Sequence, residues 1–255
     1  EIKKLLMQQM NWEFLCFSPA IDCSGTESRS NQNSAPLPIV MSTPQSQVRI
    51  ATVTEPLRCA ILISGSGSGM EAMLHHQRTS NCLHRTEVVI SNVAAAYGIE
   101  RAKHHECPVE IIELPTGLTG VERRLSHEKA IEKVLAHYRI ELIILSGYMR
   151  LLSANFVDRW AGKVVNIHPS LLPDFPGAHA HRDVIAAGVT KTGCTVHYVD
   201  AGMDTGQIIA QCEVEVLADD TEASLASRVK EFEHKLYPLV IDAIASGDFS
   251  DLPGH

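Results

Sequence analysis

The sequence predicts an α/β protein with a doubly wound, mostly parallel sheet and an antiparallel pair at one edge. Between residues 58 and 170, short and nearly continuous apolar runs alternate with segments of helical length, as in parallel strands covered on both faces. Two later runs, 194–200 and 207–216, have only a short connection between them, which favours an antiparallel pair. A final long segment carries a single apolar stripe.

The expected elements follow one another in a regular order. Strands are expected over 59–64, 86–92, 109–114, 141–148 and 163–170, and helices from near Met70, over 94–105 and over 120–140. This alternation is typical of a doubly wound sheet. The last helix, roughly Glu222 to Ala245, has apolar residues at spacings of three and four, namely Leu225, Val229, Phe232, Leu236, Val240 and Ile244.

The 255 residues divide into two parts of unequal regularity. Residues 1–56 are rich in Ser, Pro, Asn and Gln and show no sustained periodicity, so we expect a poorly ordered N-terminal extension. This segment lacks the pattern of a signal peptide. Residues 57–255 form the single expected domain, and no internal repeat is found.

Composition excludes several classes of function. The formal net charge of −8 argues against a nucleic-acid binder with a broad basic surface, but it permits a small anion pocket. No apolar stretch approaches the roughly 18 residues that cross a bilayer, so no membrane partner is expected. The seven cysteines are scattered without a C-x-x-C pair. We therefore expect a reducing, cytoplasmic location and no metal.

The glycine-rich stretch "SGSGSG", residues 64–69, follows the first expected strand. Gly65 and Gly67 fit a dinucleotide fingerprint, but Met70 stands at its third glycine, and no Lys completes a P-loop. The amides of Gly67, Ser68 and Gly69 remain, at the start of a helix. Such a helix terminus suits one phosphate monoester; the alternative is a tight turn without a ligand.

The stretch "VVNIHPSLLPDFPGAHAH" is the most informative one. Asn166 and His168 are two residues apart on a strand, so their side chains point to the same face. They stand at the carboxyl end of an inner strand, where open α/β sheets bind ligands. An imidazole can move a proton near pH 7, and an amide can donate to an oxyanion. Asp200 and Asp204 are candidate acids to orient His168, and we prefer Asp204 because it adjoins the expected turn Thr205-Gly206.

With these pieces assembled, the chain resembles the folate-dependent, single-domain phosphoribosylglycinamide formyltransferases of purine biosynthesis. The resemblance covers about residues 57–247. It is carried by "ILISGSGS", "SNVAAAYGIERA", "LSGYMRLLS", "VNIHPSLLPDFPGAH", "HYVDAGMDTGQIIAQ" and "RVKEFEHKLYPLVI", which stand in that family's order. "NIHPSLLP" is shared by a wider superfamily; the glycine turn, "PGAHAHR" and "EHKLYP" narrow the assignment.

The resemblance implies transfer of a formyl group from 10-formyltetrahydrofolate, a co-substrate, to the amine of glycinamide ribonucleotide, with Asn166, His168 and Asp204 as the catalytic residues. It implies ribonucleotide contacts at Gly67, Ser68, Gly69, Lys230 and Glu233. It implies folate contacts at Arg124, Met149, Arg150, Leu151, Leu152, Asn166, Asp200, Ala201, Gly202, Met203 and Asp204. Arg123 is an alternative to Arg124. The family usually has Asn where this chain has Gly69, so a side-chain contact to the phosphate would be lost. The expected partners are small molecules, and monomer or homodimer is left open.

Several alternatives belong to the same fold or to another class. A formyltetrahydrofolate hydrolase would use water in place of the amine, but such relatives usually carry His at the position of Ile167. A methionyl-tRNA formyltransferase would be expected to have an added C-terminal domain and a basic surface. A sugar-nucleotide formyltransferase should have "RG" where "PGAH" stands. A non-catalytic phosphosugar- or folate-binding protein would have no need of proton-transfer groups.

Overall fold

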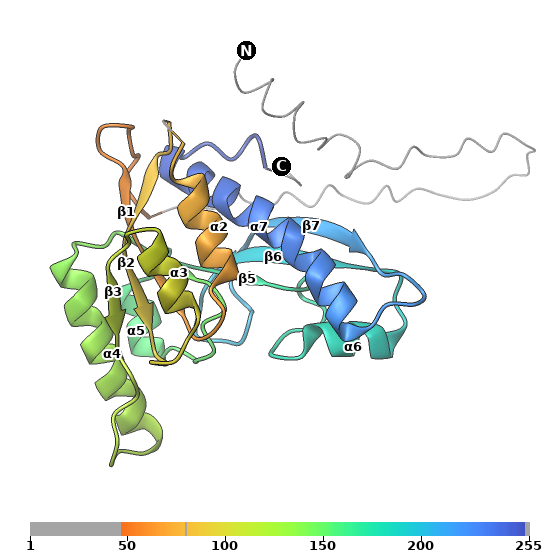
Figure 1. Ribbon diagram of the computed structural model, residues 1–255, viewed down its shortest axis with the longest axis horizontal. Coiled ribbons are helices and arrows are strands. Elements are labelled where there is room, and N and C mark those ends of the chain that lie inside the picture. Colours follow the sequence, from red (N-terminus) through yellow and green to blue (C-terminus); the bar gives the residue numbers. More distant parts are fainter. Residues whose placement is uncertain (1–46, 80, 253–255) are drawn as a thin grey trace, which may run out of the picture. The chain divides into compact units, whose positions relative to one another are not determined.

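Seven strands form one mixed sheet in the part of the chain that the computed structural model describes, residues 47–79 and 81–252. The strands lie in the order β3-β2-β1-β4-β5-β6-β7 (Figure 1). Their bounds are β1 Leu57–Ile63, β2 His84–Ser91, β3 Val109–Ile111, β4 Leu142–Leu145, β5 Val164–His168, β6 Lys191–Tyr198 and β7 Ile208–Glu215.

The pairing of the strands confirms the predicted fold class. The first five strands pair in parallel, and β6 pairs antiparallel with both β5 and β7. The edge strand β3 is shorter than the expected 109–114 and ends at Ile111, although the Ile112 N–H still donates to the Ser91 carbonyl at 2.8 Å. The central strands β1 and β4 are almost wholly buried, because helices cover both faces.

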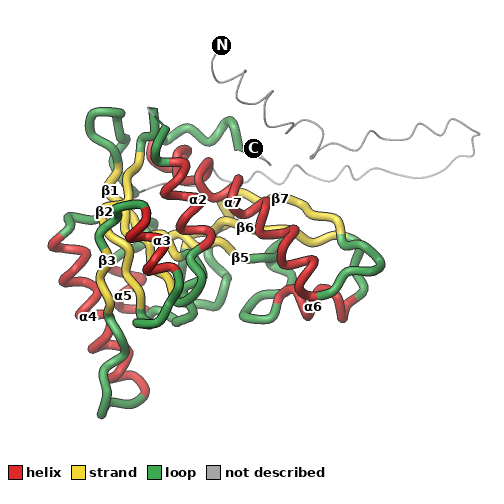
Figure 2. Tube along the Cα trace, viewed as in Figure 1, coloured by secondary structure: helices red, strands yellow, loops and turns green. Residues whose placement is uncertain are grey.

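The helices are α2 Ser68–His76, α3 Gly98–His104, α4 Gly120–His137, α5 Ala154–Arg159, α6 Ala180–Ala187 and α7 Glu222–Ser246. They are drawn in red beside the yellow strands in Figure 2. The helix expected from near Met70 begins two residues earlier, at Ser68, because Gly67 adopts a left-handed conformation and caps it. The long final helix agrees with its expected bounds to one residue.

Alternation along the strands builds two separate layers of core. One layer joins the strands to α4 and α5, through Ala60, Leu62, Val88, Ile90, Ile131, Leu135, Ile143, Leu145 and Phe156. On the other side, α2 packs against both α3 and α7 (Figure 1). There the buried Tyr237 hydroxyl of α7 lies 3.0 Å from the Leu145 carbonyl and 2.8 Å from the Val165 carbonyl, so α7 is fixed over the centre of the sheet.

Residues 47–56 contact the domain, although the sequence placed them in the N-terminal extension. The Ala51 N–H donates to the Ala245 carbonyl at 2.8 Å, and the Arg49 guanidinium binds the Glu141 carboxylate at 2.6 Å. The rest of that predicted extension lies outside the described residues. No helix in the described ranges is both long and apolar enough to cross a membrane.

The order of the strands creates a crevice between β1 and β4. The chain leaves β1 towards β2 on one side and later enters β4 on the other, so the connections after β1 and β4 diverge. Ligands of open α/β sheets bind at such a point, outside the carboxyl ends of the strands. The two connections are tied together here, because the Met149 N–H donates to Ser64 Oγ at 2.9 Å and Ser64 Oγ donates to Asn92 Oδ1 at 2.6 Å.

Candidate active site

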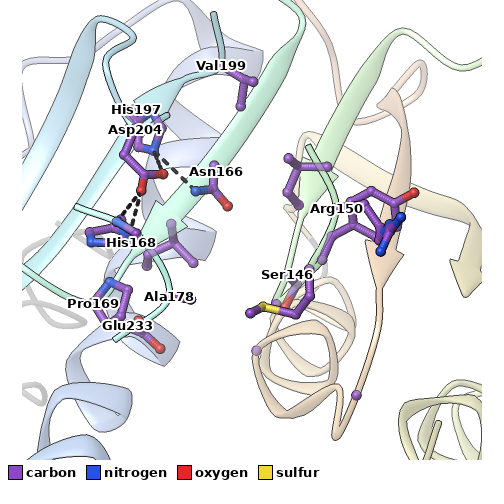
Figure 3. A pocket seen from close by; sticks show the side chains of 18 of the residues that line it. Ser146, Arg150, Asn166, His168, Pro169, Ala178, His197, Val199, Asp204 and Glu233 are labelled. Carbon is purple, nitrogen blue, oxygen red and sulfur yellow. Dashed lines mark hydrogen bonds and ion pairs between the residues drawn. The ribbon is translucent and has the colours of Figure 1, made fainter. Parts of the chain in front are cut away.

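A cavity of about 550 Å³ lies at the carboxyl ends of β1, β4 and β5. Its walls include the glycine turn, the segment after β4, the end of β5, the connection between β6 and β7, and three residues of α7. Every candidate site residue named from the sequence lines this cavity except Arg124 and Ala201. Figure 3 shows Asn166, His168, His197 and Asp204, the active-site cluster, on one side and Ser146 and Arg150 on the other.

The strand register holds the Asn166 amide in one orientation. Asn166 on β5 is paired across the sheet with His197 on β6, and its Nδ2 lies 3.2 Å from His197 Nε2. His197 Nδ1 lies 2.8 Å from the Tyr198 carbonyl, which can only accept, so Nδ1 carries a proton. Burial lowers the pKa of His197, which favours the neutral ring. Nε2 therefore accepts from the Asn166 NH₂ group, whose second hydrogen remains available to a ligand.

His168 is held so that one ring nitrogen is fixed and the other faces a carboxylate. It is buried, and its Nε2 lies 2.9 Å from the Phe175 carbonyl, so Nε2 is the protonated nitrogen of the neutral ring. His168 Nδ1 lies 3.4 Å from Asp204 Oδ2. The ring can therefore take up a proton at Nδ1, where the carboxylate stabilises the resulting charge.

The loop after β6 presents Asp204 towards the two imidazoles. Asp204 has a φ of +55°, a conformation that Asp tolerates better than most residues. Its Oδ2 accepts from the Gly177 N–H at 2.9 Å, and its Oδ1 lies 3.7 Å from His197 Nε2. A Cβ at Gly206 would lie 1.7 Å from the Tyr198 carbonyl oxygen, so only glycine permits the loop to return to β7. The backbone thus directs this carboxylate inward.

The glycine turn opens α2 towards the same cavity. No side chain caps the amino end of this helix, and the first amide that closes a helical turn is that of Glu71, which donates to the Gly67 carbonyl at 2.9 Å. The amides of Ser68 and Gly69 precede it and carry the partial positive charge of the helix terminus. A Cβ at Gly67 would lie 2.6 Å from the Gly98 Cα, so the turn needs glycine for space as well as for its φ of +69°.

Three residues of α7, namely Lys230, Glu233 and Tyr237, line the cavity together with this turn. Lys230 and Glu233 are three residues apart and so lie on the same side of the helix. Burial raises the pKa of Glu233 to about 7, and the neighbouring charge of Lys230 opposes that rise. This end of the cavity can therefore offer backbone donors, a cation and a carboxyl group that titrates near neutral pH.

The opposite end of the cavity is apolar and open. Met149, Leu151 and Met203 line it and are 63%, 60% and 52% exposed. Exposed apolar side chains gathered at one cavity are typical of a ligand site. Leu152 is partly buried against the core cluster, and the Asp200 carboxylate accepts from the Gly202 N–H at 3.0 Å, which orders the loop on the other wall.

The structure does not bring Arg124 or Ala201 into the walls of the cavity. Arg124 is exposed on α4, and the alternative residue, Arg123, donates to the Pro115 carbonyl at 3.1 Å. Ala201 is exposed on the loop that carries Asp204. Their roles stay predictions.

Sequence reasoning missed several polar residues that line the cavity, among them Ser146, His181 and His197. His197 is the most consequential, because it orients Asn166. Its position within the expected strand 194–200 was visible, but the register that sets it opposite Asn166 was not. Burial lowers the pKa of His181, whose Nδ1 is buried without a hydrogen-bond partner among the described residues.

Comparison with known proteins agrees with this geometry. The formyl transferase family matches residues 57–241. The chain is 35% identical over 191 residues to the phosphoribosylglycinamide formyltransferase of Escherichia coli, covering 75% of this chain and 88% of that protein. It is 43% identical over 190 residues to the trifunctional purine biosynthetic protein adenosine-3 of Homo sapiens, covering 74% of this chain but only 18% of that protein.

Solved structures that superpose on this chain carry names of the same family. Glycinamide ribonucleotide transformylase 1 from Symbiobacterium toebii superposes with a TM-score of 0.71 at 40% identity, over 75% of this chain and 89% of that one. The phosphoribosylglycinamide formyltransferase from Brucella melitensis gives a TM-score of 0.70 at 39% identity, over 76% and 97% of the two chains. This chain belongs to the phosphoribosylglycinamide formyltransferase family of formyl transferases.

Proposed function

We propose that this chain transfers a formyl group from 10-formyltetrahydrofolate to the amine of glycinamide ribonucleotide, a step of purine biosynthesis. The observation that carries the proposal is the convergence of an oriented amide, an imidazole and a carboxylate in one cavity with a helix terminus that no side chain caps. The names of its relatives support the same reaction.

Asn166 stabilises the negative charge that develops on the formyl oxygen. When the substrate amine attacks, the C–N bond forms and negative charge develops on the formyl oxygen. The free hydrogen of the Asn166 NH₂ group donates to this oxygen, and the His197 contact at 3.2 Å keeps it pointed there. The amide needs no reorganisation during the reaction, because His197 is itself fixed by its 2.8 Å contact with the Tyr198 carbonyl.

His168 and Asp204 move the proton that the attacking amine must lose. The amine proton passes to His168 Nδ1, the ring nitrogen left free by the Phe175 carbonyl. Asp204 Oδ2, 3.4 Å away, stabilises the imidazolium. The same proton then goes to the departing folate nitrogen, through Asp204 or an intervening water, as the bond from that nitrogen to the formyl carbon breaks.

The two substrates take opposite ends of the cavity. The ribonucleotide phosphate binds the amides at the start of α2, with Lys230 as a nearby cation, and Glu233 receives the ribose hydroxyls. The folate lies against the exposed Met149, Leu151 and Met203, and its pterin meets the backbone of Arg150 and Leu152. Arg124 would reach only the folate's glutamate tail, outside the cavity. The cysteines are scattered along the chain without a C-x-x-C pair, which supports a reducing compartment such as the cytoplasm.

The test is formyl transfer by the purified full chain. We expect 10-formyltetrahydrofolate to be consumed only when glycinamide ribonucleotide is present, with one formylated product formed per folate consumed. Asn166→Ala should reduce kcat by about 10²–10³-fold, the usual effect of losing one oxyanion donor, and should leave the melting temperature close to that of the unsubstituted chain. Consumption with water alone would instead indicate a hydrolase, and binding of both ligands without turnover would indicate a binding protein.

A further inference from the structure

A second cluster of ligating side chains lies away from the cavity. It combines the end of α2, the segment before β2, the start of β2 and the last turns of α7, and we call it the distal cluster: His76, Cys82, His84 and Asp242. One nitrogen, sulfur or carboxylate oxygen from each lies within 4.8 Å of the others. Asp242 is nine residues further along α7 than Glu233, about 14 Å at the rise of an α-helix.

From this geometry we propose that the distal cluster is a binding site for a borderline-soft divalent cation, of which Zn²⁺ is the leading candidate. The ligands are His76 Nε2, Cys82 Sγ and the Asp242 carboxylate. His76 Nε2 lies 2.7 Å from Asp242 Oδ2, and Cys82 Sγ lies 3.7 Å from Asp242 Oδ1. Tetrahedral zinc holds nitrogen, oxygen and sulfur ligands about 3.3–3.6 Å apart, so small side-chain shifts would admit the ion.

The chemistry of the donors selects the class of ion. One thiolate, one imidazole and one carboxylate suit zinc and its neighbours in the first transition series, whereas Mg²⁺ and Ca²⁺ prefer oxygen ligands alone. The thiolate and the carboxylate together balance a charge of +2. Of the described cysteines, Cys82 alone is not buried. His76 and Asp242 side chains are 26% and 32% exposed, so an ion and a fourth ligand such as water can reach the site.

His84 serves this site from the outer shell. The Thr86 N–H donates to Gln77 Oε1 at 2.9 Å, so the Gln77 NH₂ group faces His84 Nδ1 at 2.8 Å. Nδ1 therefore accepts, and the ring proton of neutral His84 is on Nε2. Metal binding would release the proton that His76 Nε2 shares with Asp242. The His84 side chain, by contrast, is fully buried and its Nε2 lies 3.3 Å from Asp242 Oδ1, so we assign it to the outer shell. A histidine that orients a ligating carboxylate is a common outer-shell arrangement.

The ion would join the end of α2 to the last turns of α7, two helices that also line the active site, α2 with its first turn and α7 with its middle. His76 is the last residue of α2, whose first turn faces the cavity, and Asp242 follows Glu233 on α7. The site is thus a structural clamp between α2 and α7, which already pack together. It takes no part in the proposed formyl transfer, and its test is independent of that function.

The first test measures the metal itself, with the full chain kept reduced. After exposure to Zn²⁺ and extensive dialysis, we expect one zinc ion per chain and an increase in melting temperature. Replacement by Co²⁺ should give intense visible bands of a tetrahedral site and a near-ultraviolet sulfur-to-cobalt band. If no ion is retained, or if the retained cobalt shows no sulfur band, the proposal is wrong.

Matched variants separate this site from adventitious binding to a chain with 13 histidines. Cys82→Ser should abolish the sulfur band, and His76→Ala should weaken Zn²⁺ binding at least tenfold. His75→Ala, at the exposed neighbouring position on α2, and Cys107→Ala, at a buried cysteine, should change neither. Equal losses in these two controls would overturn the proposal. His84→Gln should weaken binding by about 10–100-fold yet keep the sulfur band; loss of the band in His84→Gln would overturn the outer-shell assignment.

Discussion

The active-site cluster and the distal cluster contain the same core of two histidines and one aspartate, held in different ways. In the distal cluster, Asp242 lies 2.7 Å and 3.3 Å from its two imidazoles. In the active-site cluster, Asp204 lies 3.4 Å and 3.7 Å from His168 and His197. Asp204 therefore lies further from its two imidazoles than Asp242 does. Its side chain is nevertheless the less exposed of the two, at 15% against 32% for Asp242.

The difference follows from what else holds each group. The backbone fixes the active-site side chains separately, through the Phe175 carbonyl on His168, the Tyr198 carbonyl on His197 and the Gly177 N–H on Asp204. Their mutual contacts, at 3.4 and 3.7 Å, are longer than hydrogen bonds, so each side chain is held by the backbone and not by its neighbours. The side chains of the distal cluster contact one another directly, so their opposite charges neutralise each other over shorter distances than in the active site. The same types of side chain can thus form a catalytic site where the backbone holds each one separately, or a stabilising contact where they bind one another.

The largest effect is expected for Asp204→Asn. Asparagine keeps an oxygen for the Gly177 N–H at 2.9 Å, but it neither takes a proton nor neutralises the His168 imidazolium. We expect kcat to fall by about 10²–10⁴-fold, with a melting temperature close to that of the unsubstituted chain. Steady-state kinetics and thermal unfolding check both. Asp200→Asn, on the same loop, tests the other candidate carboxylate and should lower kcat less than Asp204→Asn does; a larger loss there would reassign the catalytic carboxylate.

The second-largest effect is expected for Asp242→Asn, which should lower stability and leave activity nearly unchanged, the opposite of Asp204→Asn. The change removes the charge from a carboxylate that faces two imidazoles, and it should lower the free energy of unfolding by about 1–3 kcal/mol. Formyl transfer at saturating substrates should stay within twofold, because the cluster lies outside the cavity. Urea unfolding of the metal-free chain measures the stability. A loss of turnover without a loss of stability would erase the distinction between the two clusters.

The sequence predicted the active-site cluster better than the distal one, for a physical reason. Asn166 and His168 share a strand, so alternation alone puts them on one face, and Asp204 follows from a turn and from the family resemblance. His197 needed the strand register, which side-chain alternation does not define. The distal contacts join residues 160 and 166 positions apart, Cys82 and His76 to Asp242. Only the packing of α7 on α2 brings them together, so the scattered cysteines gave no sign of a metal site.

The parallel core was predictable because buried strands read as continuous apolar runs, as in "LIIL" of β4. The ends of elements were less predictable. The run 109–114 contains a strand of only three residues, since β3 lies at the edge and pairs with β2 alone. The start of α2 depended on the left-handed Gly67, which no periodicity reveals.

A third carboxyl group, that of Glu233, extends the comparison to pH, because it lies partly buried beside Lys230. Burial raises its pKa from 4.5 to about 7, so the folded chain retains a proton that the unfolded chain releases. The free energy of unfolding should therefore fall as pH rises from about 4.5 to about 7 and level off above that. Glu233→Gln should remove this contribution and be the more stable protein at pH 8. Urea unfolding from pH 5 to pH 8 measures it, with Glu231→Gln as the exposed control on the same helix; an unchanged slope in Glu233→Gln would contradict the assignment.

The smallest effect concerns Gly69, where the family usually has Asn. A Cβ at Gly69 would lie 2.8 Å from Ser146 Oγ, so in Gly69→Ala that hydroxyl must rotate away from the start of α2. If Ser146 donates to the phosphate, losing this hydrogen bond costs about 1 kcal/mol and raises KM for the ribonucleotide about fivefold. Ser146→Ala should cause the same rise, and the double variant should add nothing to it. Additive effects in the double variant would mean that the helix amides bind the phosphate without help from Ser146. Folding stability should not suffer, because alanine favours a helix over glycine by about 0.5–1 kcal/mol.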